Sequence, residues 1–132
     1  HGIVGAPPGA YWDGGITDYH LHLLYQPRAG SPIVLYPHFQ RQVVPGWLDK
    51  MWGRRHHASA ALDDMLVIAP DPAWVATLPN SKLPDRTDFT AYGNDLAGRV
   101  SAWSVATAAS QRLADEWAQW LERPDPALVQ AL

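Results

Sequence analysis

Two continuous apolar runs constrain the fold of this chain more than any other feature. The run at 33–36 lies inside the segment 31–39 and is bounded by Pro32 and Pro37, and the second run covers 65–69. An apolar run of this length, without alternating polar positions, is typical of a strand that is covered on both faces. Such strands belong mainly to parallel sheets that lie between helices, so the two runs predict an α/β fold.

Weaker patterns predict two further strands near the N-terminus. The segment 20–25 alternates around Leu21 and Leu23, which favours a strand. The segment 11–13 is a short strand-like piece that stops at a pair of glycines.

Helix signals follow later in the chain. Asp71 as N-cap and Pro72 at the first helical position predict a short helix that runs to about residue 78. Residues 47–52 are expected to form another short helix. Residues 79–88 are expected to form a polar loop, with their acidic side chains as caps or in solvated turns.

The clearest helix is predicted to begin at Asn94 or Asp95 and to end before Pro124, a length on the order of 40 Å. Its apolar positions recur in steps of three and four and mark one face, which indicates core packing. These positions are Leu96, Val100, Trp103, Ala106, Leu113, Trp117, Trp120 and Leu121.

Together these elements predict one α/β domain over residues 1–132, with helices covering a largely parallel sheet. The small number of strands indicates that the sheet continues in another part of the protein, since an open edge would otherwise stay unpaired. The chain begins with His1 rather than Met, and residues 1–5 read like the middle of a sequence. We therefore expect a portion of a larger domain.

Composition narrows the classes of function. A net charge of −3 gives no basic footprint for nucleic acid, and the absence of cysteine removes disulfides and thiolate nucleophiles. No apolar run approaches the roughly 18 residues of a membrane span. The Gly- and Pro-rich start lacks the Gly-Lys-Ser/Thr ending of a phosphate loop. We expect no cofactor and no bound metal.

The turn Asp13-Gly14-Gly15 is the first candidate for chemistry. An Asp at the end of a strand, followed by two glycines, places a carboxylate on a sharp turn beside a sheet. The glycines would permit positive φ and the close approach of another group to the backbone. Asp-Gly is also one of the commonest turn dipeptides, so on spacing alone a plain turn remains open.

The surroundings of this turn resemble the catalytic-aspartate segment of patatin-like phospholipases, in which an aromatic-x-Asp-Gly-Gly/Ala motif follows a loop. Residues 2–19 carry the resemblance, with Trp12 before Asp13. The segments 35–39, 44–50 and 83–89 and the long helix also look like bacterial members. The ordered set covers most of residues 2–123.

The resemblance implies the C-terminal part of a three-layer α/β/α serine acyl hydrolase, cytoplasmic or peripheral to the membrane. It implies a Ser–Asp dyad that hydrolyses lipids or other carboxylic esters, with Asp13 as the catalytic aspartate and Gly14 and Gly15 beside it. The family's serine lies in a Gly-x-Ser-x-Gly segment. None of the chain's serines has that setting: Ser31, Ser59, Ser81, Ser101, Ser104 and Ser110. We therefore expect the N-terminal part of the same protein to carry the serine, and this chain alone to be inactive.

In such a dyad the carboxylate takes the serine proton directly. The ordinary pKa of an Asp, about 3.9, is low for that task, so partial burial is expected to raise it. The apolar neighbours expected to bury Asp13 are Tyr11, Trp12 and Ile16.

A second candidate is the pair His20 and His22, which a strand would place on one face. Two such imidazoles can bind zinc or iron, with Asp18 or His38 completing the site, so a metal-binding domain is one alternative function. A solvated or cleft-facing edge is the simpler interpretation. Another interpretation of this pair is that His20 or His22 lines the acyl cleft near Asp13.

A third candidate is the basic group at residues 54–57, which follows Trp47, Met51 and Trp52. Basic residues beside aromatic ones are suited to anionic lipid headgroups, and a solvated loop is the simpler interpretation. A non-catalytic α/β domain that contacts a lipid surface or another protein is therefore a further alternative function.

Overall fold

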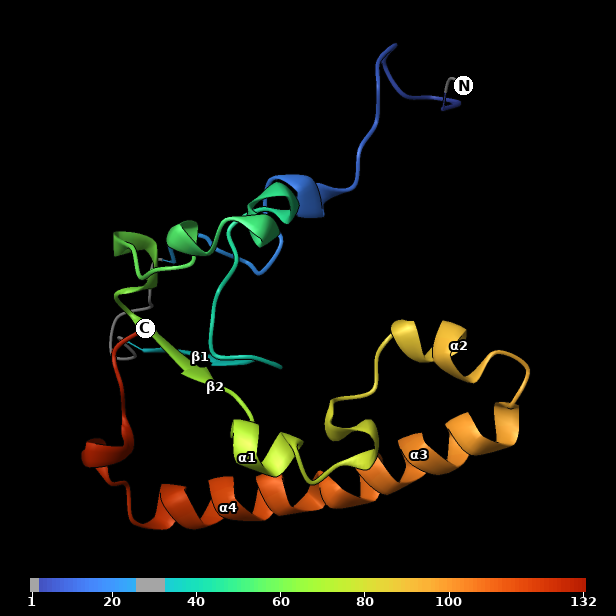
Figure 1. The fold of residues 1–132 in the computed structure, drawn as a ribbon. Helices are drawn as coiled ribbons and strands as arrows, with labels where there is room; N and C mark the ends of the chain where they lie inside the picture. Colours follow the sequence, from blue (N-terminus) through green and yellow to red (C-terminus); the bar gives the residue numbers. More distant parts are fainter. Residues whose placement is uncertain (1–2, 26–32) are drawn as a thin grey trace. The chain divides into compact units, whose positions relative to one another are not determined.

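The computed structural model describes residues 3–25 and 33–132 (Figure 1). The strands are β1 (Val34–Pro37) and β2 (Met65–Ile68). The α-helices are α1 (Pro72–Val75), α2 (Thr87–Tyr92), α3 (Leu96–Ala109) and α4 (Gln111–Glu122). The 3-10 helices are η1 (Gly14–Ile16), η2 (Trp47–Met51), η3 (Gly53–Arg55), η4 (Ala60–Leu62), η5 (Pro79–Ser81) and η6 (Pro126–Leu128).

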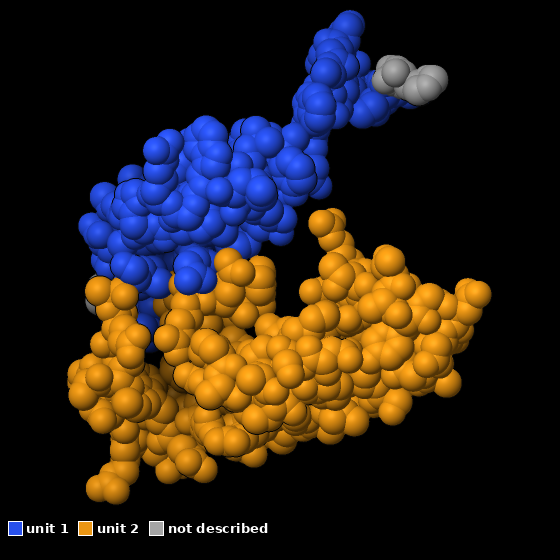
Figure 2. Space-filling model, viewed as in Figure 1, with its two compact units in different colours: residues 1–36, 42–66, 132 blue, residues 37–41, 67–131 orange. Residues whose placement is uncertain are grey.

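The described residues divide into two compact units (Figure 2). The first consists of residues 1–36, 42–66 and 132, and the second of residues 37–41 and 67–131. The buried apolar side chains of the first unit are Val43, Val44 and Leu62, and those of the second are Leu78 and Ala106. Both cores are small, and the prediction of a single domain stays a prediction.

The two apolar runs form strands, as predicted, and pair in a two-stranded sheet. The Val34 amide donates to the Asp64 carbonyl at 2.7 Å, and the His38 amide donates to the Ile68 carbonyl at 2.8 Å. Both residue numbers increase together along the pair, so the strands are parallel. The fold is therefore of the mixed α/β kind that the runs predicted.

The prediction that β1 is covered on both faces is wrong. Its side chains alternate between half-buried and exposed, and Leu35 is exposed. The physical reason is the width of the sheet, since two strands with few covering elements leave one face of β1 open.

The strands predicted at 20–25 and 11–13 are wrong, because both segments lack strand pairing. Leu21 has φ 52°, a left-handed conformation that interrupts an extended chain. The His22 amide donates to the Asp18 side chain at 2.9 Å, where a strand amide would donate to a neighbouring strand. Side-chain-to-backbone bonds thus take the place of a ladder.

The short-helix predictions are confirmed with small changes in length. The Asp71 carboxylate accepts from the Ala73 amide at 2.7 Å, as an N-cap should, but α1 ends at Val75. The helix expected at 47–52 is the 3-10 helix η2. The prediction of a loop over 79–88 missed η5 and the start of α2.

The long C-terminal helix is confirmed as two segments, α3 and α4, that meet at Ser110 (Figure 1). The Ser110 backbone keeps helical angles, with φ −67° and ψ −17°. Its hydroxyl donates to the Thr107 carbonyl at 2.7 Å, a side-chain bond that bends helices.

The apolar stripe of this helix is covered mainly in its middle. Ala106 is buried and Trp103 is half-buried, where α3 packs against α2 and η5. The core packing predicted for the stripe does not extend to Leu96, Val100 and Leu121, which are exposed. Within residues 3–25 and 33–132, no helix combines the length and the apolar character that crossing a bilayer requires.

Candidate active site

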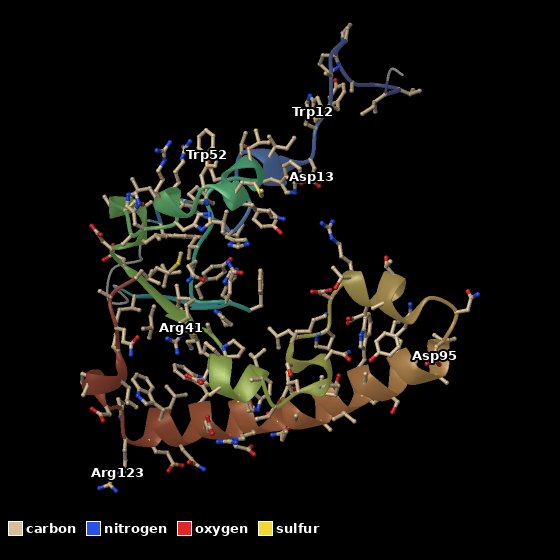
Figure 3. All side chains as sticks on the ribbon, in the orientation of Figure 1. Trp12, Asp13, Arg41, Trp52, Asp95 and Arg123 are labelled. Carbon is tan, nitrogen blue, oxygen red and sulfur yellow. The ribbon has the colours of Figure 1, made fainter. Side chains whose placement is uncertain are left out.

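Asp13 lies where the N-terminal segment meets η1 (Figure 3). It is the N-cap of this 3-10 helix, with extended backbone angles of φ −62° and ψ 137°. Its Oδ1 atom accepts a 2.7 Å hydrogen bond from the Gly15 amide, and its carbonyl accepts one from the Ile16 amide at 3.1 Å. The turn itself therefore fixes one carboxylate oxygen.

Gly15 allows this close approach. A Cβ atom at position 15 would lie 2.9 Å from Asp13 Oδ1, closer than such contacts occur, whereas a Cβ at Gly14 would meet nothing within 4 Å. Neither glycine has positive φ, so that part of the expectation is wrong. The turn therefore needs glycine at position 15, where a side chain would collide with the Asp13 carboxylate, and not at position 14.

The segment 44–50 holds the Asp13 turn in place. The Tyr19 amide donates to the Pro45 carbonyl at 2.9 Å, and a Cβ at Gly46 would lie 2.8 Å from the Ile16 carbonyl oxygen. The Lys50 ammonium lies 4.0 Å from the centre of the Tyr19 ring, a cation–π contact. Backbone bonding and close packing thus join η1 to η2.

The expected burial of Asp13 is not found among the described residues. Asp13 is exposed, and Trp12 is 78 % exposed. The Tyr11 hydroxyl donates to the Pro7 carbonyl, so this ring is directed toward the N-terminal segment. Only Ile16 is half-buried. The neighbours of Asp13 in the first unit therefore leave this carboxylate without apolar cover.

His20 has a structural role in the first unit. It is 5 % exposed, its Nδ1 accepts a 2.9 Å hydrogen bond from the Val44 amide, and its ring stacks on Tyr19. Because Nδ1 accepts, the neutral ring carries its proton on Nε2. The prediction that both histidines share the face of a strand is wrong, since no strand forms there.

His22 contacts Ser59, which is 37 residues away in the sequence. The Ser59 Oγ and His22 Nε2 atoms are 2.9 Å apart, and both residues are half-buried. No sequence pattern joins these two positions, so the contact could not be predicted. Among the described residues, His22 and Asp13 share no hydrogen-bond partner: His22 bonds to Asp18 and Ser59, and Asp13 bonds to Gly15. That His22 lines a cleft near Asp13 therefore stays a prediction.

Across residues 3–25 and 33–132, no three His, Cys, Asp or Glu side chains gather as metal ligands. His38, the third ligand considered, has its Nδ1 2.8 Å from the Gln40 carbonyl oxygen.

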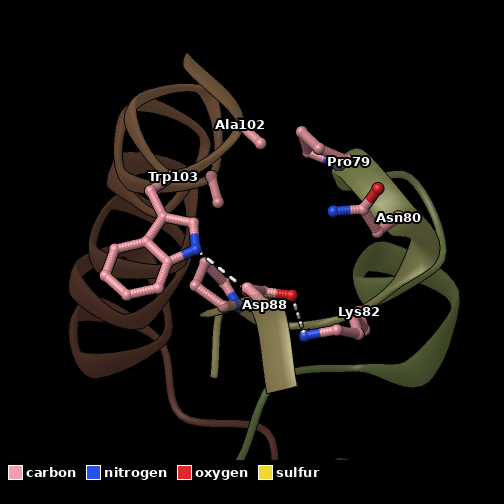
Figure 4. A pocket seen from close by; sticks show the side chains of 8 residues that line it. Pro79, Asn80, Lys82, Asp88, Ala102 and Trp103 are labelled. Carbon is pink, nitrogen blue, oxygen red and sulfur yellow. Dashed lines mark hydrogen bonds and ion pairs between the residues drawn. The ribbon is translucent and has the colours of Figure 1, made fainter. Parts of the chain in front are cut away.

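A charged group in the second unit was also missed by sequence reasoning. Figure 4 shows Lys82, Asp88 and Trp103 among the residues that line a recess between η5, α2 and α3. Asp88 is buried, so the prediction of a solvated turn is wrong for it, whereas the prediction of a cap is met, because its Oδ2 accepts from the Asp85 amide at 3.1 Å at the start of α2. Lys82 Nζ lies 2.7 Å from Asp88 Oδ1, and the Trp103 indole donates to Oδ2 at 2.9 Å. The group joins η5, α2 and α3.

These contacts shift the ionisation of the group. The hydrogen bond from Lys82 holds the pKa of Asp88 below its usual value, helped by the Asp85 amide and the Trp103 indole and opposed by burial. Burial alone would lower the pKa of Lys82, but its bonds to Asp88 and Asp85 outweigh this and raise it. The Thr87 hydroxyl and amide, together with Lys82, lower the pKa of Asp85 to about 2.

The chain matches no family model, and neither a curated protein nor a solved structure matches it.

Proposed function

We propose that this chain supplies the general base of a Ser–Asp acyl hydrolase, with Asp13 as that base. The proposal rests on one observation. Asp13 Oδ1 is fixed by the Gly15 amide, while within residues 3–25 and 33–132 no group donates a hydrogen bond to Oδ2. A carboxylate with one oxygen held and one exposed can take a proton from an incoming hydroxyl. The resemblance selects Asp13 from the N-cap aspartates that share this arrangement, such as Asp125.

The fold context supports this role. Two of the segments that resemble patatin-like phospholipases are in contact, because the Asp13 turn packs on the Pro45-Gly46 turn. Among the described residues the sheet has only β1 and β2, so each strand has an edge at which a sheet could continue in another part of the protein. We propose that the chain is the C-terminal part of a three-layer α/β/α domain, whose N-terminal part brings the Gly-x-Ser-x-Gly segment and covers Asp13.

In the proposed reaction, Asp13 Oδ2 takes the proton of the serine hydroxyl as Oγ attacks the ester carbonyl carbon. The carbon–oxygen bond to the alcohol then breaks, and Asp13 returns the proton to the leaving oxygen. Water, activated by the same carboxylate, hydrolyses the acyl-serine ester and regenerates the enzyme. The substrate class is a lipid or another carboxylic ester, a proposal that rests on the resemblance.

A fluorophosphonate probe tests which serine is activated, because this reagent phosphonylates nucleophilic serines. The native protein is labelled and digested, and the modified peptide is identified by mass spectrometry. Labelling of a serine between two glycines, outside these 132 residues, is the expected result. Labelling of Ser59 would contradict the proposal and would point to the Ser59–His22 pair, and a protein without labelled serine would contradict it as well.

A further inference from the structure

The segment 47–57 differs in charge from the rest of the chain. It contains three cations, Lys50, Arg54 and Arg55, and one carboxylate, Asp49, which gives a formal charge of +2. The whole chain has a net charge of −3, so the remaining residues carry −5. Positive charge is therefore concentrated on η2 and η3.

The single carboxylate of this segment is directed inward. The Asp49 side chain is 15 % exposed, its Oδ2 accepts from the Gly46 amide at 3.0 Å, and its Oδ1 lies 3.2 Å from Arg55 Nε. Its negative charge is therefore satisfied within the unit. The charge that this segment presents to solvent comes from the cations.

Apolar side chains are exposed on η2 and at Trp52, the residue between η2 and η3. Met51 is 88 % exposed and Leu48 is 65 % exposed, and Trp47 and Trp52 are also exposed. Single exposed apolar residues are common, but four within six residues form a patch. Such a patch next to cations is the composition of a surface that enters the headgroup region of a membrane.

Each exposed tryptophan of the patch lies beside a cation. The guanidinium carbons of Arg54 and Arg55 lie 5.6 and 5.9 Å from the Trp52 ring centre, and Lys50 Nζ lies 5.7 Å from that of Trp47. Trp52 marks this segment in Figure 3. Indole rings and basic side chains both favour the boundary between lipid headgroups and acyl chains. We call residues 47–55 the cationic–aromatic surface.

We propose that the cationic–aromatic surface binds the surface of an anionic phospholipid bilayer. The cations attract the phosphate groups, and Leu48 and Met51 enter the boundary with the acyl chains. The two exposed aliphatic side chains favour lipid over nucleic acid, because a nucleic-acid surface uses aromatic stacking and basic side chains and has no partner for them. Because Arg55 pairs with Asp49, the net charge of the surface is +2, which gives reversible binding that weakens as salt screens the charges.

This binding does not require Asp13. The segment 44–50, which includes most of η2, also holds the Asp13 turn in place. If Asp13 acts as the general base proposed above, lipid binding by η2 would place this base near the membrane surface.

The test is sedimentation of the 132-residue chain with vesicles of phosphatidylcholine, with or without phosphatidylglycerol. We expect binding to the anionic vesicles that falls as salt is raised, and weak binding to the neutral ones. The Arg54→Gln variant is expected to bind about fivefold more weakly. The Met51→Ser variant is expected to bind roughly tenfold more weakly. Neither side chain takes part in the hydrogen bonds or ion pairs that hold η2 to η1.

Matched variants separate lipid binding from a general loss of charge or of structure. Arg54→Lys and Met51→Leu should bind nearly as the parent chain does, and Arg123→Gln, far along the sequence at the end of α4, should have no effect. Equal binding to neutral and anionic vesicles would overturn the proposal. So would unchanged binding by Arg54→Gln and Met51→Ser, or binding to single-stranded DNA without binding to vesicles. None of these outcomes bears on ester hydrolysis, which is measured separately.

Discussion

The Gly15 amide donates a 2.7 Å hydrogen bond to Asp13 Oδ1, and a Cβ at position 15 would lie 2.9 Å from the same atom. A larger residue at 15 would therefore displace the carboxylate, which is the end of a flexible side chain and moves at small cost. A substitution at position 15 is therefore expected to change the position of the Asp13 carboxylate, and with it the activity, more than the stability of the fold.

The Gly15→Ala variant of the protein that carries the serine is expected to lose activity with little loss of stability. A carboxylate displaced by about an ångström loses roughly a hundredfold in kcat/KM. The free energy of unfolding should change by less than about 1 kcal/mol. Gly14→Ala is the control, because a Cβ there meets nothing within 4 Å. If both variants hydrolysed esters equally well, the proposed position of Asp13 would be wrong.

The second unit is expected to lose stability in acid through Asp88 and Asp85. A carboxyl whose pKa is lower in the folded than in the unfolded state stabilises the fold above its unfolded pKa, and this contribution is lost as the pH falls through the folded value. The window therefore begins near 3.8, the ordinary value, and extends down to about 2 for Asp85. Thermal melts followed by circular dichroism between pH 6 and pH 2 measure the loss.

The Asp88→Asn variant should lower the melting temperature at pH 6 and flatten this acid dependence, since the neutral amide cannot pair with Lys82. Asp63→Asn is a matched control, because Asp63 is exposed. An acid dependence as steep in Asp88→Asn as in the parent chain would show that Asp88 does not carry it.

Replacement of Trp103 by Phe is expected to cost about 1–2 kcal/mol of unfolding free energy, measured by urea denaturation. The variant keeps the ring that packs edge-on against Phe89 but loses the indole bond to Asp88. Trp117→Phe is the comparison, because Trp117 stacks on Trp120 and its indole makes no hydrogen bond within the described residues. A larger loss in the Trp117 variant would contradict the importance of the bond to Asp88.

The His20→Leu variant is expected to lose about 1–3 kcal/mol of stability, because the buried Val44 amide then has no acceptor. His57→Leu, at an exposed histidine, should change stability little. The parent chain should show no rise in melting temperature with added zinc, since a metal that binds the folded state would stabilise it. A rise with zinc that His20→Leu abolishes would restore the metal-binding alternative.

The sequence predicted the elements whose local signals are strong. Apolar runs located β1 and β2, the Asp71–Pro72 pair located the start of α1, and helical spacing located α3 and α4. Each of these depends on residues close together in the chain. Alternation at 20–25 was misleading, because a left-handed Leu21 and the bond from the His22 amide to Asp18 decide the backbone there.

The candidate site could be predicted only in part. The Asp13 turn is local, so its motif was visible. Its attachment to Gly46, the pairing of His22 with Ser59 and the burial of Asp88 all depend on contacts between distant segments. Asp88 is an example of a charge whose burial follows from its partners, Lys82 and Trp103, which no single-residue pattern reveals.

Ester hydrolysis by Asp13→Asn, in the protein that also carries the Gly-x-Ser-x-Gly segment, tests the central claim most directly. The asparagine oxygen can still accept from the Gly15 amide, so the turn and the melting temperature should be preserved, while the amide nitrogen cannot take the serine proton. The expected result is a fall in kcat of about 10²- to 10⁴-fold, with Asp63→Asn unaffected. Turnover by Asp13→Asn close to that of the parent protein would contradict the assignment of Asp13 as the base.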